Sequence, residues 1–256
     1  MKYGQKKRSS LTVVIPVYNE SILLEQSFSS IRSFIHRERD VSVDVIFVDD
    51  GSPDNSYELL KDLVKRSDIA NHCEILHYDK NRGKGYAVRK GILAAGGSYI
   101  LMSDFDLSTP LEQWRKLKHA LDMGADFAIG SRAVLGAQIG HKAPFHRRIL
   151  SKVFNLLVHW AGVKGIRDTQ CGFKLFRRGP AHRVFEALRT ARFAFDVEMI
   201  AVARLYGFKV AEIAVRWDYS GHSTVRIFSS GFRMIWDLMR LVLRRWIGGN
   251  RIYLKK

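Results

Sequence analysis

The chain has 256 residues, of which 46% are hydrophobic, and this length is enough to bury a full core in one large domain. Its two cysteines, Cys73 and Cys171, lie far apart without metal-ligand spacing, which argues against a disulfide framework and a zinc site and fits a reducing, cytoplasmic setting. The net charge of +17 indicates a polyanionic partner, while the lack of a signal peptide or a spanning apolar stretch leaves only peripheral contact with a membrane.

In the first half of the chain, short β-branched runs alternate with amphipathic stretches. Residues 11–17 and 43–48 are predicted strands, with a helix over 21–39 between them. The pattern continues with a helix over 56–66, a strand over 73–77, a helix over 85–95 and strands over 98–102 and 127–130. This alternation predicts βαβ units and a mostly parallel sheet in an α/β fold.

The second half of the chain is less regular and strongly basic. The first 131 residues hold 18 basic and 18 acidic residues, and the remainder hold 24 and 7. A basic segment over 141–152, an apolar helix-like run to Trp160 and a loop DTQCGFKLF over 168–176 come first, and two further helices are expected to close the chain.

The last predicted helix, over 232–247, is amphipathic. It places Arg233, Asp237, Arg240 and Arg244 on one narrow face, and its remaining surface is mostly apolar, with Trp236 among it. Such a helix suits burial at the headgroup boundary of a membrane, although packing on the protein's own core would produce the same pattern.

Acidic residues directly follow two of the predicted strands, where ligands bind in open parallel sheets. Asp104 and Asp106 form an Asp-x-Asp after the strand over 98–102, and an extended backbone would send both carboxylates to one side. Such a pair can hold Mg²⁺ or Mn²⁺ against a diphosphate, while a solvated turn is the alternative. Asp49 and Asp50 follow the strand over 43–48 and can accept hydrogen bonds from a base or ribose, whereas Asp54 or Ser56 is expected to cap the next helix.

The sequence Asn81-Arg82-Gly83-Lys84-Gly85 opens the helix that follows the third strand. Its glycines would let the backbone approach a ligand, and its two cations could meet phosphate. It has neither the residue spacing of a Walker motif nor the Lys-Ser/Thr pair that ends such a motif, so an ordinary basic turn is the alternative interpretation.

Taken together, PVYNE, VDDGSPDNS, NRGKG and SDFDLSTP, in this order and spacing, resemble the family-2 inverting glycosyltransferases, whose nucleotide-diphosphosugar-binding fold is called GT-A. GSR at 130–132, the arginine pair at 147–148, DTQCGFKLF and FDVEM at 195–199 are similar to the branch of dolichyl-phosphate glucosyltransferases and polyprenyl-phosphate mannosyltransferases. The resemblance covers about residues 11–226. We therefore expect a GT-A domain over 1–226 and a basic, amphipathic, membrane-associated segment over 227–256.

The resemblance also implies roles for individual positions. The nucleotide-sugar pocket would be formed by Pro16, Tyr18, Glu20, Asp49, Asp50, Arg82, Lys84 and Asp104. Asp106 would bind Mg²⁺ or Mn²⁺ directly with Asp104 beside it, although Ser108 replaces a glutamine that often assists in mannosyltransferase relatives. The acceptor phosphate would be held by Arg132, Arg147 and Arg148, with Asp168 and Lys174 close by. The catalytic set is thus Asp104, Asp106, Arg132, Arg147 and Arg148.

The expected reaction is metal-dependent transfer of a hexose, with inversion, from a nucleotide-sugar to a polyprenyl or dolichyl phosphate at the cytoplasmic face of a membrane. UDP-glucose is favoured by the DTQCGFKLF resemblance, and GDP-mannose is the alternative donor. A polysaccharide or protein hydroxyl is the alternative acceptor, with Asp196 or Glu198 as base. A nucleic-acid-binding protein would not explain the acidic clusters behind the strands, and a non-catalytic sensor would not need them intact. The apolar last helix is also compatible with a homodimer.

Overall fold

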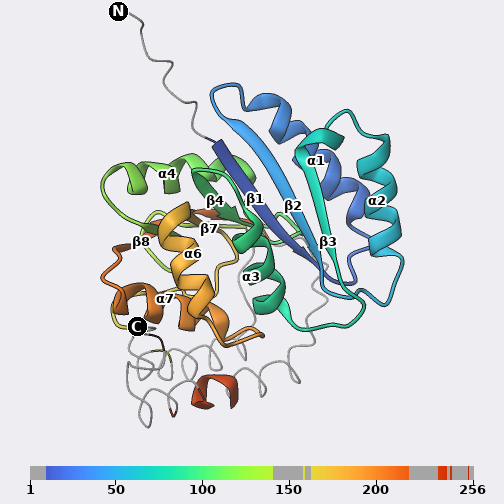
Figure 1. Ribbon diagram of the computed structural model, residues 1–256. Coiled ribbons are helices and arrows are strands. Elements are labelled where there is room, and N and C mark those ends of the chain that lie inside the picture. The colour runs from blue at the N-terminus through green and yellow to red at the C-terminus, as the bar shows by residue number, and fades with distance from the viewer. Residues whose placement is uncertain are drawn as a thin grey trace, which may run out of the picture.

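The computed structural model describes residues 10–140, 158, 163–218, 236–240, 243 and 253. Their centre is a seven-stranded sheet in the order β3-β2-β1-β4-β7-β5-β8 (Figure 1). Its strands are β1 (Ser10–Val17), β2 (Ser42–Asp49), β3 (Cys73–His77), β4 (Tyr99–Met102), β5 (Phe127–Ser131), β7 (Lys174–Arg177) and β8 (Val210–Ala214). Among these strands, only β7 runs antiparallel to its neighbours, β4 and β5, so the predicted mostly parallel sheet is confirmed.

The helices cover both faces of this sheet. They are α1 (Leu24–Arg37), α2 (Ser56–Arg66), α3 (Lys84–Ala94), α4 (Trp114–Asp122), α6 (Arg178–Ala187) and α7 (Phe195–Leu205), with short 3₁₀ turns η1 (Ala70–His72) and η2 (Leu111–Gln113). A separate two-stranded sheet pairs β6 (Gln138–Ile139) with β9 (Arg216–Trp217). The predicted boundaries in the first half agree with these elements to within a few residues.

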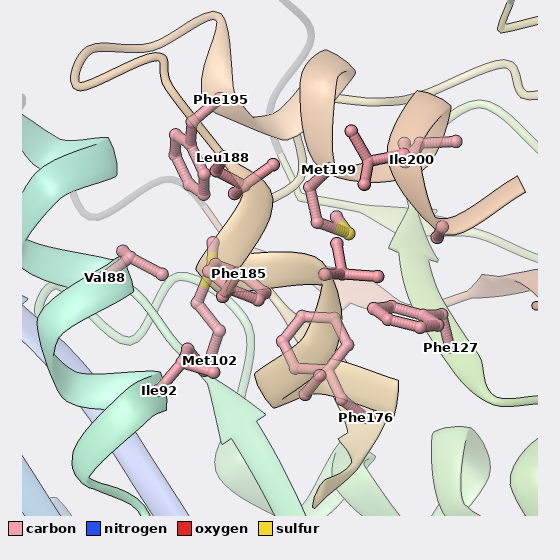
Figure 2. Close-up of a cluster of buried hydrophobic side chains, with 14 of the residues drawn as sticks. Val88, Ile92, Met102, Phe127, Phe176, Phe185, Leu188, Phe195, Met199 and Ile200 are labelled. Atoms are coloured by element: carbon pink, nitrogen blue, oxygen red, sulfur yellow. The ribbon is translucent and has the colours of Figure 1, made fainter. Parts of the chain in front are cut away.

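Two apolar clusters form the core, one on each face of the sheet. Because side chains alternate along a strand, Val13 and Val14 of β1 belong to different clusters. Figure 2 shows the cluster that joins α3, α6 and α7 to the sheet, where Ile92, Phe185 and Met199 pack against strand residues such as Phe176. The other cluster joins α1 and α4 to the opposite face. Each helix therefore buries its apolar stripe, as the periodicity predicted.

The prediction that residues 168–176 form a loop throughout is wrong at its end, because Lys174 to Phe176 belong to β7. This short strand fills the space between β4 and β5 and pairs with both. Since backbone N–H and C=O groups buried at these positions need partners, the sheet is continuous only with β7 in place.

Several predicted features lie partly or wholly outside the described residues. Arg147, Arg148 and the basic segment over 141–152 fall there, as does most of the last predicted helix. Residues 236–240 and 243 of that helix are described and are helical. No helix in the described part of the chain combines the length and apolar character needed to cross a bilayer.

Candidate active site

The loops after β1 and β2 are joined side by side at the carboxyl ends of these strands. Three backbone N–H groups of the first loop donate to side chains of the second: Asn19 to Ser52 Oγ at 3.1 Å, Glu20 to Ser56 Oγ at 2.8 Å and Ser21 to Asp54 Oδ2 at 3.2 Å. Asp54 also accepts from the Ser56 N–H at 3.1 Å, directly before α2, whereas the N-cap residue of that helix is Asn55. The contacts to Ser52 and Ser56 were not predicted, since nothing in the sequence pairs the two loops.

Glu20, Asp104 and Asp106 bring three carboxylates together behind the neighbouring strands β1 and β4. Burial, followed by the charges of Asp106, Asp104 and Asp54, raises the pKa of Glu20 to about 7. The Asp-x-Asp segment is not extended as predicted: it forms a turn in which the Leu107 N–H donates to the Asp104 carbonyl at 3.2 Å, and Leu107 has φ +48°. This left-handed conformation is unusual for leucine and is characteristic of functional loops.

The Asp106 carboxylate is held in one orientation by Ser108. It accepts from the Ser108 N–H at 3.0 Å and from Ser108 Oγ at 2.8 Å. Ser108 therefore orients the Asp106 carboxylate, a role that the sequence did not indicate.

The donor chemistry of this cluster suits a hard divalent cation. Crowded carboxylate oxygens are the ligands that Mg²⁺ and Mn²⁺ favour, and a cation would offset the repulsion that raises the pKa of Glu20. Among the described residues, no three His, Cys, Asp or Glu side chains are grouped so that they could hold a metal ion by themselves. Mg²⁺ often takes only one or two carboxylates from a protein and completes its shell with water and substrate phosphates.

Asp49 and Asp50 use their oxygens within the protein. Asp49, fully buried, accepts from Ser52 Oγ at 2.5 Å and lies 2.9 Å from His77 Nδ1. Asp50 is also buried and accepts from Tyr78 Oη at 2.7 Å and from the backbone N–H groups of Arg82 and Gly83 at 2.8 and 2.9 Å. Contact of either residue with a nucleotide stays a prediction. In the structure they fix the loops that follow β2 and β3.

The NRGKG segment, residues 81–85, places Lys84 against the Asp-x-Asp turn. Lys84 Nζ lies 2.5 Å from Asp104 Oδ1. Burial alone would raise the pKa of Asp104, but Lys84, Lys174 and Arg132 hold it below its usual range. Arg82, by contrast, is exposed and stacks over the ring of Tyr86 at 4.1 Å.

Arg132, at the end of β5, forms a two-pronged ion pair with Asp168. Its Nε and Nη2 donate to the two Asp168 oxygens at 2.7 and 3.0 Å, and its backbone N–H also donates to Oδ2 at 3.0 Å. Burial would raise the pKa of Asp168, but these contacts lower it. The Arg132 side chain as a whole is 32% exposed, and its guanidinium carbon lies 5.4 Å from the Trp217 ring centre.

Lys174 is placed differently from its prediction as an acceptor-binding residue. Its side chain is fully buried, and Nζ donates to the Cys171 carbonyl and to Asp196 Oδ1, each at 2.5 Å. With no exposed surface, the ammonium group is not positioned to touch an acceptor. Burial also raises the pKa of Asp196 above its usual range, although Lys174 and Lys84 oppose this.

We expect a Lys174→Met variant to lose about 3 kcal/mol of unfolding free energy, because it leaves the buried Asp196 carboxylate without its counter-ion. Urea denaturation measures this loss. A Lys174→Met/Asp196→Asn double variant should recover part of it, and a single variant as stable as the parent would contradict the role of the pair.

Gly172 is a residue of the site that the sequence did not single out. A Cβ atom built on it would lie within 2.6 Å of both carboxylate oxygens of Asp104, so only glycine permits this approach. Gly172 lies inside DTQCGFKLF, and this motif is the one feature of the sequence that could have pointed to it. Of the other predicted residues, Pro16 is half-buried in β1 and Tyr18 is 41% exposed beyond it.

Comparisons with known proteins agree with this geometry. Residues 12–185 match the family described as "Glycosyl transferase family 2". The chain is 35% identical over 249 residues to a dolichyl-phosphate beta-glucosyltransferase of Dictyostelium discoideum, covering 93% of this chain and 75% of the relative. It is 36% identical over 252 residues to the Homo sapiens protein of that name, covering 94% and 78%.

Solved structures show the same fold at low sequence identity. Mycobacterium tuberculosis glucosyl-3-phosphoglycerate synthase, in complex with Mn²⁺, UDP and phosphoglyceric acid, superposes with a TM-score of 0.62 at 16% identity, covering 91% of this chain and 78% of that one. Mannosyl-3-phosphoglycerate synthase from Rubrobacter xylanophilus superposes with a TM-score of 0.58 at 17% identity, covering 97% and 76%. Both are similar to this chain in fold.

Proposed function

The chain belongs to glycosyltransferase family 2, in the branch of the dolichyl-phosphate β-glucosyltransferases, and from this premise we propose that it transfers glucose from UDP-glucose to a dolichyl or polyprenyl phosphate with inversion. The observation that carries the proposal is the arrangement of charge around Asp104. The carboxylates of Glu20 and Asp106 lie near Asp104, and Arg132, which follows β5, is one of the cations that lower the pKa of Asp104. The carboxylates suit a cation bound to a nucleotide diphosphate, and Arg132 suits an acceptor phosphate.

The donor would lie along the loops that follow β1, β2 and β4. Tyr18 is exposed there, and the NRGKG loop supplies Lys84. Asp106, with Asp104 beside it, would hold Mg²⁺ or Mn²⁺, which when bound offsets the charge that develops on the departing diphosphate. Lys84 would add a fixed positive charge next to the same phosphates.

The acceptor would bring its own nucleophile. A phosphate monoester carries about −1.5 to −2 charges at neutral pH, so its oxygen needs no general base. In the transfer, this oxygen bonds to the anomeric carbon of glucose while the bond from that carbon to the β-phosphate oxygen of UDP breaks, and UDP leaves with the electron pair. Arg132, oriented by Asp168, would neutralise and aim the acceptor, and Arg147 and Arg148 are proposed to assist.

The structure gives little support to the hydroxyl-acceptor alternative. Asp196 is buried and bound to Lys174, and Glu198 is fully buried, with Oε2 accepting from two backbone N–H groups and Oε1 accepting from the Tyr253 hydroxyl. Neither carboxylate offers exposed surface on which a hydroxyl group could lie within proton-transfer distance.

The function is tested by incubating the purified protein with Mg²⁺ or Mn²⁺, a short polyprenyl phosphate and either UDP-glucose or GDP-mannose. Mass spectrometry should detect a glucosyl lipid, and NMR should show the β-configuration. Product from GDP-mannose alone would reassign the sugar. Donor hydrolysis without lipid product would reject the lipid-phosphate acceptor, and retained configuration would reject the single displacement.

We propose further that the segment over 227–256 contacts the membrane surface. In its described residues, Leu238 is buried while Trp236, Met239 and Leu243 are 54%, 41% and 59% exposed. Positions three and four apart share one helix face, so these three side chains form an apolar stripe that faces away from the core.

A Trp236→Ser/Leu243→Ser variant should therefore float several-fold less with vesicles of phosphatidylcholine and phosphatidylglycerol than the parent protein does. Leu135→Ser is the matched control, because Leu135 is 98% exposed and lies in a turn elsewhere in the chain. If the parent is instead a dimer in solution that the substitutions dissociate, the stripe is a homodimer interface.

A further inference from the structure

Glu198 connects three segments that are distant in the sequence. It lies on α7 with a fully buried side chain. Its Oε2 accepts from the backbone N–H groups of Arg189 and Thr190 at 3.1 and 2.8 Å, and its Oε1 accepts from Tyr253 Oη at 2.8 Å. A buried carboxylate needs such donors, so the loss of one weakens its hold on the others.

The loop held by Glu198 supports the NRGKG loop. The Tyr86 N–H donates to the Ala191 carbonyl at 2.9 Å. Cβ atoms built on Gly83 and Gly85 would lie 2.6 Å from the Ala191 carbonyl oxygen and 2.8 Å from that of Arg192. The two loops are thus in backbone contact, and Lys84, between these glycines, reaches Asp104.

Tyr253 belongs to the C-terminal end of the chain and is fixed there independently. It is 4% exposed within the core cluster that contains Leu238, and its carbonyl accepts from Tyr206 Oη at 2.5 Å. Tyr253 therefore contacts the same carboxylate that holds the loop supporting the NRGKG segment.

We propose that Tyr253 is a positioning residue for donor binding: its hydroxyl orients Glu198, which holds residues 189–192 against the NRGKG loop. The proposal rests on the proposed function in that this loop binds the donor diphosphate. In a Tyr253→Phe variant, packing is kept and the hydroxyl is lost, so the loop should loosen around the donor while the reacting groups remain unchanged.

Hydrogen exchange of the ligand-free protein tests the coupling without reference to any substrate. Tyr253→Phe should speed amide exchange in peptides covering 189–192 and 83–86 by about threefold to tenfold, and leave β1 and β2 unchanged. Tyr206→Phe is the matched control. It removes another tyrosine hydroxyl bound to the same C-terminal residue and leaves the donors to Glu198 intact, so exchange in these two peptides should change much less than in Tyr253→Phe.

Calorimetry with UDP and steady-state kinetics complete the test. Tyr253→Phe should raise the Kd for UDP and the donor KM by about threefold to tenfold, with kcat within about twofold of the parent value. Equal effects of Tyr206→Phe and Tyr253→Phe, or unchanged exchange at 83–86 in Tyr253→Phe, would overturn the coupling. If the parent binds no UDP, the proposed donor fails, while the exchange experiment still decides the role of Tyr253.

Discussion

An Asp106→Asn variant should transfer glucose on the order of 10³-fold more slowly than the parent chain. Asparagine keeps the size of the side chain and one acceptor oxygen, but it removes the charge that a divalent cation needs. Because Ser108 holds the side chain through two hydrogen bonds, the substitution should change charge more than position. Mn²⁺ affinity in the presence of UDP, measured by calorimetry, should fall together with kcat.

The matched control is Asp122→Asn, which removes a carboxylate from the surface of α4, where it pairs with Lys118. That variant should keep parental activity and Mn²⁺ affinity. A parental rate for Asp106→Asn would remove this carboxylate from the reaction and with it the proposed role of the Asp-x-Asp turn.

A Gly172→Ala variant should lose about 10²-fold in kcat/KM, although the substitution adds only a methyl group. Its Cβ would overlap the Asp104 carboxylate, so either Asp104 or the backbone of residues 171–173 must move. Displacement of a reacting group by about 1 Å is enough for a loss of this size. Steady-state kinetics measures the effect, and circular dichroism establishes that the variant is folded.

Gly179→Ala provides the comparison within the same part of the chain. Gly179 lies in the first turn of α6, and a Cβ atom built on it would meet no atom of a more distant residue within 4 Å, so alanine should leave kcat/KM at the parent value. Parental kinetics for Gly172→Ala would show that Asp104 does not need the position it has in the structure.

Most of the fold could be predicted from the first half of the chain, where each strand is a β-branched run that ends in a polar loop. There, local pattern and tertiary position agree: β1 and β2 were predicted almost to the residue. The strand β7 was not predicted, because four residues following a polar loop carry no periodicity of their own. It is a strand because two neighbouring strands need its hydrogen bonds.

The sequence predicted which residues belong to the site better than it predicted the contacts that they make. The sequence indicated that carboxylates follow successive strands, and the structure brings Glu20 close to Asp104 and Asp106. It did not indicate that Lys174 is buried, since lysine is mostly exposed in proteins and its partner Asp196 lies on another element. Long-range pairs of this kind, like the Tyr253–Glu198 contact, leave no mark on local sequence spacing.

The position of β7 has a consequence for how the protein is made. During synthesis, β4 and β5 leave the ribosome before the strand that must lie between them, so both expose unpaired backbone edges until residues 174–177 arrive. The N-terminal half therefore cannot reach its final sheet while it emerges. Chains that end before β7 should aggregate through these open edges, and a chaperone that shields them would act within this interval of translation.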